Sequence, residues 1–72
     1  MTPSAAANRV GLPQAPSSEL KKKAESFHAQ GYTARKNGDF QAAISLYSKA
    51  LEIYPHHFKA LFNRGFAFDK LG

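Results

Sequence analysis

Histidines are the residues of this 72-residue sequence best suited to bind a metal ion or transfer a proton near neutral pH. His28 stands alone, whereas His56 and His57 are adjacent and directly follow Pro55. Adjacent side chains after a proline point in different directions, and no carboxylate lies close to this pair in the sequence. A metal site needs ligand atoms that converge on one point. We therefore expect no metal site and no cofactor.

Catalytic residue patterns are also missing from the sequence. It has no cysteine nucleophile, no paired carboxylates, no glycine loop that could cradle a phosphate, and no serine beside a base and an orienting acid. We therefore expect a protein without enzymatic activity.

The charge balance favours acidic partners. Ten lysines and arginines stand against five acidic residues, which gives a net charge of +5. Such an excess attracts acidic proteins and leaves weak nucleic-acid binding as an alternative. The run Lys21-Lys22-Lys23 is expected to be a solvated helix face. No apolar run reaches the roughly 18 residues of a membrane span, and the first residues lack the apolar core of a signal peptide. The organelle stays open, with the cytoplasm as the first expectation.

A helix–turn–helix unit organises the elements that would position these groups. Gly38 suits the left-handed conformation just past a helix, and Asp39 can cap the next helix with its carboxylate. Pro55 then ends the second helix, because it lacks an N–H and its ring clashes with the preceding turn. The first helix is predicted to open at Ser17 or Ser18, and the second to span about 40–54.

Small residues predict how these helices pack. Gly31 lies inside the first helix, where a glycine costs about 1 kcal/mol relative to alanine, so we expect the partner helix to come too close there for a side chain. Apolar residues at helical spacing on the second helix form two stripes, one for the first helix and one for a third. The third helix is predicted to begin near Phe58. Residues 1–17, rich in proline and small residues, are predicted to be a disordered leader.

The third helix repeats the first with a fixed offset. An offset of 34 residues carries Phe27, Gly31 and Ala34 onto Leu61, Gly65 and Phe68. A helical hairpin with this period is typical of tetratricopeptide repeats. The segment GYTARKNGDFQAAISLYSKALEIYP resembles one such repeat in its small, aromatic and proline positions, and FKALFNRGFAFDKLG resembles the first helix of another.

The resemblance implies an all-α fold: an antiparallel helical hairpin with a third helix stacked on it, as in an α-solenoid. Residues 18–72 would be the helical segment, with 24–57 as a full repeat and 58–72 as the first helix of a second. Stability in such arrays comes largely from neighbouring repeats, and about three are normally needed. We therefore expect either a part of a longer array or a chain that self-associates through its third helix.

The resemblance also implies a function, because the first helices of such repeats line a groove that binds peptides or other proteins. The candidate groove residues are Glu25, His28, Ala29, Tyr32, Arg35 and Lys36 on the first helix, and Lys59, Phe62, Asn63, Phe66 and Lys70 on the third. A partner would be a protein or peptide, with the basic residues favouring acidic segments. One subgroup grips a terminal carboxylate with a conserved set of lysines and asparagines. Only Asn63 matches that set, since His28 and Tyr32 replace its first two members, so this specific function is not expected.

Overall fold

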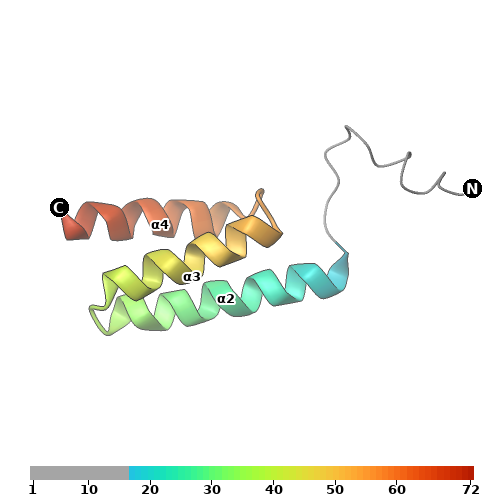
Figure 1. Cartoon of the computed structure of the whole chain (residues 1–72), viewed down its shortest axis with the longest axis horizontal. Helices are drawn as coiled ribbons and strands as arrows, with labels where there is room; N and C mark the ends of the chain where they lie inside the picture. Colours follow the sequence, from blue (N-terminus) through green and yellow to red (C-terminus); the bar gives the residue numbers. More distant parts are fainter. Residues whose placement is uncertain (1–16) are drawn as a thin grey trace, which may run out of the picture.

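Three α-helices joined by two short connections make up the computed structural model, which describes residues 17–72 (Figure 1). The helices are α2 (Ser18–Lys36), α3 (Phe40–Ile53) and α4 (Phe58–Leu71). Residues 17–72 contain no strand, which confirms the predicted all-α class. The predicted disordered leader lies outside the described residues, apart from Ser17.

The turn between α2 and α3 has the predicted geometry. Gly38 adopts a φ of +83°, which a residue with a Cβ rarely tolerates. Its N–H donates to the Arg35 carbonyl at 2.9 Å, which satisfies one of the carbonyls left free at the end of α2. Asp39 then caps α3, because its carboxylate accepts from the Ala42 N–H at 3.1 Å. The chain therefore reverses direction in three residues.

The other helix ends follow local chemistry as well. Ser17 caps α2 by accepting from the Leu20 N–H at 3.2 Å, as predicted. The predicted end of α3 at residue 54 is wrong by one residue, since α3 ends at Ile53. Tyr54 has φ −137° and ψ 88°, because a residue before proline is pushed out of the helical region. At α4 the cap is His57, whose Nδ1 accepts from the Ala60 N–H at 3.2 Å.

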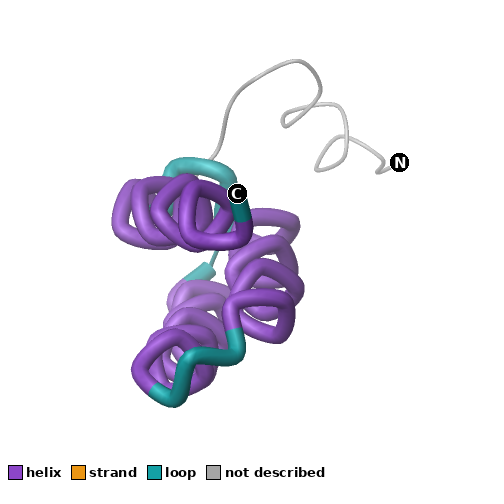
Figure 2. Tube along the Cα trace, turned by 90° about the vertical axis from the view of Figure 1, so that its left-hand side faces the viewer, coloured by secondary structure: helices purple, strands orange, loops and turns teal. Residues whose placement is uncertain are grey.

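Helix α3 lies between the other two and packs on both. Viewed end-on, α2 and α4 lie on the same side of α3 (Figure 2). The core is built from small residues around one large ring: five alanines and Tyr47 have no exposed surface, the alanines being Ala24, Ala43, Ala50, Ala60 and Ala67. Small side chains let the helix axes approach closely, and the Tyr47 ring fills the space that remains.

Gly31 on α2 lies directly against the Tyr47 ring of α3. A Cβ built on Gly31 would lie 2.7 Å from Cε1 and 2.8 Å from Cδ1 of Tyr47, closer than real Cβ atoms come to a ring. This confirms the predicted reason for the glycine. Gly65, its counterpart in α4, has no such neighbour among the described residues.

Candidate functional site: the face shared by α2 and α4

Arg35 connects the two helices that line the predicted groove. Its guanidinium carbon lies 5.0 Å from the centre of the Tyr32 ring on α2 and 4.3 Å from the centre of the Phe66 ring on α4. Both distances are within the range of a cation–π interaction. One guanidinium nitrogen also donates to Asn63 Oδ1 at 3.2 Å. These four residues, Tyr32, Arg35, Asn63 and Phe66, are called the arginine cluster below.

Two lysines extend the positive charge on either side of the arginine cluster. Lys36 Nζ lies 5.7 Å from the centre of the Tyr32 ring, and Lys70 Nζ lies 5.4 Å from the centre of the Phe66 ring. Both lysines are exposed. Each aromatic ring is therefore covered by Arg35 and flanked by a lysine, which gives a surface that is apolar and cationic at once.

Phe62 presents the largest exposed apolar side chain on this face. It is 74% exposed, and Tyr32 on α2 is 42% exposed. Exposed aromatic side chains are enriched at protein-binding sites, because they bury a large area with few rotatable bonds. The predicted apolar contacts are therefore accessible to a partner.

His28 was predicted to line the groove, but its side chain is nearly enclosed. It is 8% exposed, and its Nε2 accepts from Asn63 Nδ2 at 3.0 Å. Burial lowers the pKa of His28 below its ordinary value of 6.5, against an opposing effect of Glu25. A buried neutral histidine supports Asn63 from below, so a partner would meet Asn63 and not the imidazole.

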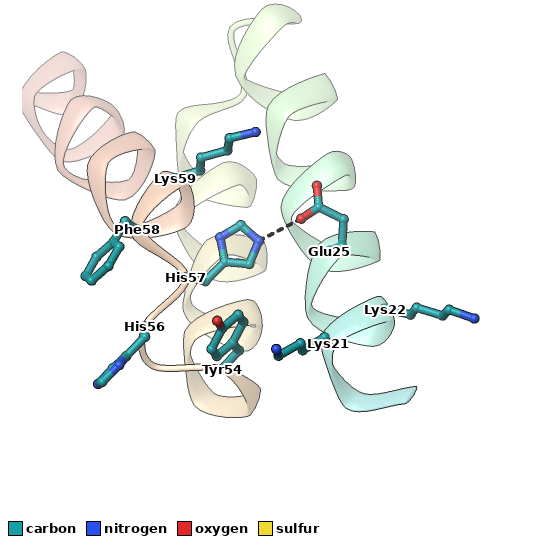
Figure 3. Close-up of a pocket in the computed structure, with 8 residues that line it drawn as sticks. All are labelled: Lys21, Lys22, Glu25, Tyr54, His56, His57, Phe58 and Lys59. Carbon is teal, nitrogen blue, oxygen red and sulfur yellow. Dashed lines mark hydrogen bonds and ion pairs between the residues drawn. The ribbon is translucent and has the colours of Figure 1, made fainter. Parts of the chain in front are cut away.

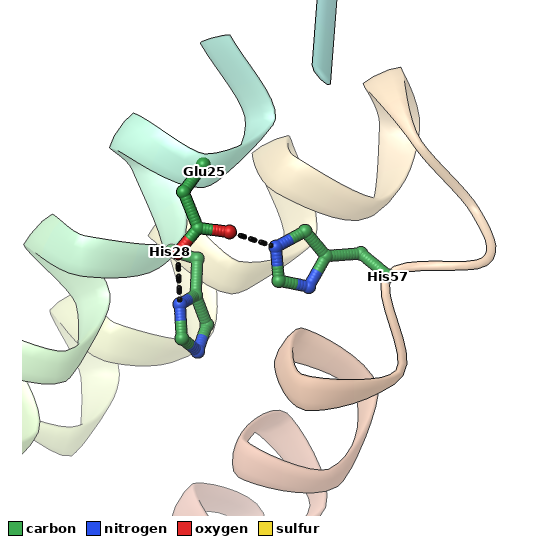
Figure 4. A group of neighbouring side chains, drawn as sticks. All are labelled: Glu25, His28 and His57. Carbon is green, nitrogen blue, oxygen red and sulfur yellow. Dashed lines mark hydrogen bonds and ion pairs between the residues drawn. The ribbon is translucent and has the colours of Figure 1, made fainter. Parts of the chain in front are cut away.

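Glu25 and His57 form a contact that the sequence did not predict. His57 Nε2 lies 2.9 Å from Glu25 Oε1, and His28 Nδ1 lies 3.5 Å from Glu25 Oε2 (Figure 4). Although no carboxylate lies close to His57 in the sequence, the fold brings Glu25 beside it. The hairpin brings the chain back alongside the first half of α2 by residue 57, and this return is the signal that would have placed the two residues together. These three residues are called the histidine cluster below.

Hydrogen-bond directions define the proton positions in the histidine cluster. His57 Nδ1 accepts from a backbone N–H, so its Nε2 carries the proton and donates to Glu25. His28 Nε2 accepts from Asn63, so its Nδ1 carries the proton that faces Glu25. The hydrogen bond from His57 is the main cause that lowers the pKa of Glu25, with burial opposing it. Glu25 is therefore a carboxylate between two neutral imidazoles.

Lys59, another predicted groove residue, lines an open pocket at the other end of the molecule. The pocket has a volume of about 580 Å³ and is lined by Lys21, Lys22, Glu25, Tyr54, His56, His57, Phe58 and Lys59 (Figure 3). Lys21 Nζ lies 5.5 Å from the centre of the Tyr54 ring. Three lysines around aromatic walls make this pocket positive, like the arginine cluster. Lys59 is thus set apart from the arginine cluster.

A comparison with protein families adds to this geometry. The family model described as tetratricopeptide repeat matches residues 24–57, from the second turn of α2 to the residue before α4. Residues 24–57 are a tetratricopeptide repeat. Repeats of this family are protein-interaction units without a catalytic role of their own. No curated protein and no solved structure matches the chain.

The length and apolar character of the three helices decide whether any of them could span a membrane. Within residues 17–72, none of the helices combines the length and the apolar character that crossing a membrane requires.

Proposed function

We propose that the chain binds an acidic segment of a partner protein on the face that α2 and α4 share. The observation that carries the proposal is the arginine cluster. Arg35 is held by two rings and by Asn63 before any partner arrives. A positioned side chain loses little conformational freedom when it binds, so more of the contact energy remains as affinity.

Each part of the face has a distinct role in this proposal. Arg35 uses one of its N–H groups on Asn63, and its remaining donors can take a carboxylate of the partner. Lys36 and Lys70 attract acidic side chains from either side. Tyr32 and Phe62 offer apolar contact. Rim charges such as the two lysines increase the association rate and the specificity more than the final affinity.

A labelled acidic peptide with one central aromatic residue tests the proposal. Its affinity, measured by fluorescence anisotropy, should fall as salt rises from about 50 mM to about 500 mM, because exposed charges are screened over shorter distances. Charge reversal in Lys36→Glu and Lys70→Glu should each weaken binding by about tenfold at low salt. A peptide with lysines in place of its acidic residues should not bind.

Lys49→Glu is the matched control for these charge reversals. Lys49 is the exposed lysine of α3, and its Nζ lies 5.7 Å from the Phe27 ring, away from the arginine cluster. Its reversal changes the net charge by the same amount and should leave the affinity nearly unchanged. An equal loss in all three variants would mean that only net charge attracts the peptide. Stronger, peptide-independent binding to RNA with a steep salt dependence would favour nucleic-acid binding instead.

Self-association is a second candidate function, supported by the apolar surface of α4. Large side chains stay exposed along this helix, with Phe58 at 71% and Phe68 at 55%. A circular-dichroism melt at several protein concentrations tests it, since a midpoint that rises with concentration indicates folding coupled to association. A midpoint independent of concentration would exclude it.

A further inference from the structure

We propose that the histidine cluster, Glu25, His28 and His57, binds a divalent transition-metal ion, with Zn²⁺ as the best match. One ligand atom from each of the three residues lies within 4.8 Å of the others (Figure 4). Two imidazoles and one carboxylate are a common ligand set for Zn²⁺. The site goes beyond the peptide-binding face, because it joins the middle of α2 to the start of α4.

The distances in the histidine cluster are close to those of a coordination sphere. Bonds of about 2.0–2.1 Å to a tetrahedral Zn²⁺ hold neighbouring ligand atoms about 3.3 Å apart. His57 Nε2 and His28 Nδ1 lie 2.9 Å and 3.5 Å from the two oxygens of Glu25. The two imidazole rings lie 4.9 Å apart, centre to centre. Side-chain adjustments alone can therefore bring the three ligands onto one ion.

A buried nitrogen without a hydrogen bond is the independent observation at this site. His28 Nδ1 is buried and makes no well-formed hydrogen bond among the described residues, because its contact with Glu25 Oε2, at 3.5 Å, is longer than ordinary N–H···O bonds. Buried polar atoms are normally satisfied, and one that is not needs a reason. A metal ion between His28 and Glu25 would satisfy it.

The surroundings of the cluster suit an ion with an open coordination position. The side chains of His28 and His57 are 11% and 7% exposed, whereas the Glu25 side chain is 61% exposed. Two buried imidazoles hold the ion on the protein side, and the exposed carboxylate leaves a solvent side where water can complete four ligands. Mg²⁺ and Ca²⁺ prefer sites made of oxygen atoms, so the two nitrogens favour Zn²⁺ over them.

Binding requires a proton shift within each imidazole. The nitrogens that face Glu25 carry protons in the metal-free chain, and each proton must move to the outer nitrogen before the lone pair can bind the ion. For His28 the outer Nε2–H then donates to Asn63 Oδ1 once that amide turns over, and Arg35 loses its hydrogen bond to that oxygen. For His57 the outer Nδ1–H can no longer accept from the Ala60 N–H. No net proton is released, because both imidazoles stay neutral and Glu25 stays a carboxylate.

This proton shift gives the proposal a specific spectroscopic signature. The Ala60 amide loses its cap, and the side-chain amide of Asn63 exchanges its partners. Both ¹⁵N-¹H signals should therefore shift when metal binds. An ion held only by surface charge would leave both of them in place.

Titration of the tag-free, EDTA-treated chain with ZnCl₂ tests the proposal. Calorimetry should give one ion per chain, and the thermal midpoint should rise as Zn²⁺ is added, because an ion that binds only the folded state stabilises it. Glu25→Gln keeps the size of the side chain and should weaken binding more than about tenfold. His57→Ser removes the imidazole but keeps an oxygen that can cap α4, so it should fold and also lose binding.

His56→Ala is the matched control. His56 is exposed, adjacent in sequence, and outside the histidine cluster, so its removal should leave the Zn²⁺ affinity unchanged. The proposal is overturned if no binding occurs up to about 100 μM Zn²⁺, since structural and catalytic zinc sites bind more tightly. It is equally overturned if His56→Ala weakens binding as much as His57→Ser does, which would indicate an adventitious ion held by exposed histidine. Neither outcome affects the peptide-binding proposal, because that proposal is tested at Lys36 and Lys70, which lie outside the histidine cluster.

Discussion

Replacing Gly31 with alanine adds a single methyl group where α2 lies against the Tyr47 ring of α3. That carbon would lie 2.7 Å, 2.8 Å and 3.2 Å from three atoms of the Tyr47 ring. The ring has no exposed surface, so it cannot move into solvent without leaving the core. One of the two helices or the ring must therefore shift by several tenths of an ångström.

Two opposing effects decide the size of the change. Alanine is favoured over glycine inside a helix by about 1 kcal/mol. Forcing an extra carbon into a packed core typically costs about 1–3 kcal/mol. The ring is fully buried and the overlap involves two atoms under 3 Å, so the upper half of that cost applies. We expect Gly31→Ala to lower the free energy of unfolding by about 1–2 kcal/mol net.

Gly65 provides a control with the opposite expected sign. It lies inside α4 at the equivalent position of the next helix, and nothing within 4 Å would meet its Cβ. Gly65→Ala therefore gains the helix preference without the overlap and should raise the free energy of unfolding by about 1 kcal/mol. In a domain of this size a change of about 1 kcal/mol corresponds to about 4–8 °C in the thermal midpoint.

Urea unfolding followed by circular dichroism at 222 nm measures both variants. The reasoning predicts two midpoints displaced to opposite sides of the wild type. It is refuted if Gly31→Ala is as stable as Gly65→Ala, because the contact with Tyr47 would then impose no cost. Gly31→Leu, with a far larger overlap, should remove the helical signal at all urea concentrations.

Three further predictions follow from the caps, the core and the histidines. Asp39→Ala should lower the free energy of unfolding by about 1 kcal/mol, because the Ala42 N–H loses its acceptor, and an unchanged urea midpoint would contradict this. Tyr47→Phe should change the free energy of unfolding by less than about 1 kcal/mol, since the buried hydroxyl makes no well-formed hydrogen bond among the described residues and only lies near Arg35; a larger loss of stability in the same assay would show that Arg35 is a true partner. In EDTA, the free energy of unfolding should decline as pH falls below about 6.5, because burial lowers the pKa of His28 in the folded chain while His28 of the unfolded chain takes up a proton. The decline with pH should be weaker in His28→Gln. An equally steep decline in that variant would refute the lowered pKa of His28.

Local residue chemistry predicted most of the helix boundaries. Gly38 and Asp39 define the turn by their own conformational and capping preferences, whatever the rest of the chain does. Gly31 was predictable for a different reason, since a glycine inside a helix is costly and a close partner explains it. The end of α3 at Ile53 was missed by one residue, because the effect of Pro55 on the residue before it was left out.

The candidate site was less predictable, because it depends on how the helices meet. The family resemblance placed Tyr32, Arg35 and Phe66 on one face, but it did not place Arg35 between the two rings. The sequence also gave no indication that His28 would be buried beneath Asn63. Side-chain orientation at an interface between helices depends on packing, which helical spacing alone does not describe.

The histidine cluster is the clearest case of a feature that the spacing of residues along single helices did not reveal. Glu25 and His57 are 32 residues apart and meet only because the hairpin closes. His57 is also an unusual helix cap, since caps are mostly serine, threonine, asparagine or aspartate. The spacing of apolar residues predicted where α4 begins. It did not predict that His57 caps the helix.

Chemical-shift mapping of the ¹⁵N-labelled chain with the acidic peptide tests the central claim most directly. The account predicts that the largest shifts fall on the arginine cluster and on Phe62, with α3 nearly unaffected. Shifts restricted to the segment Lys21–Lys23, or spread evenly over every exposed lysine, would contradict it, because the peptide would then follow charge and not the face that α2 and α4 share.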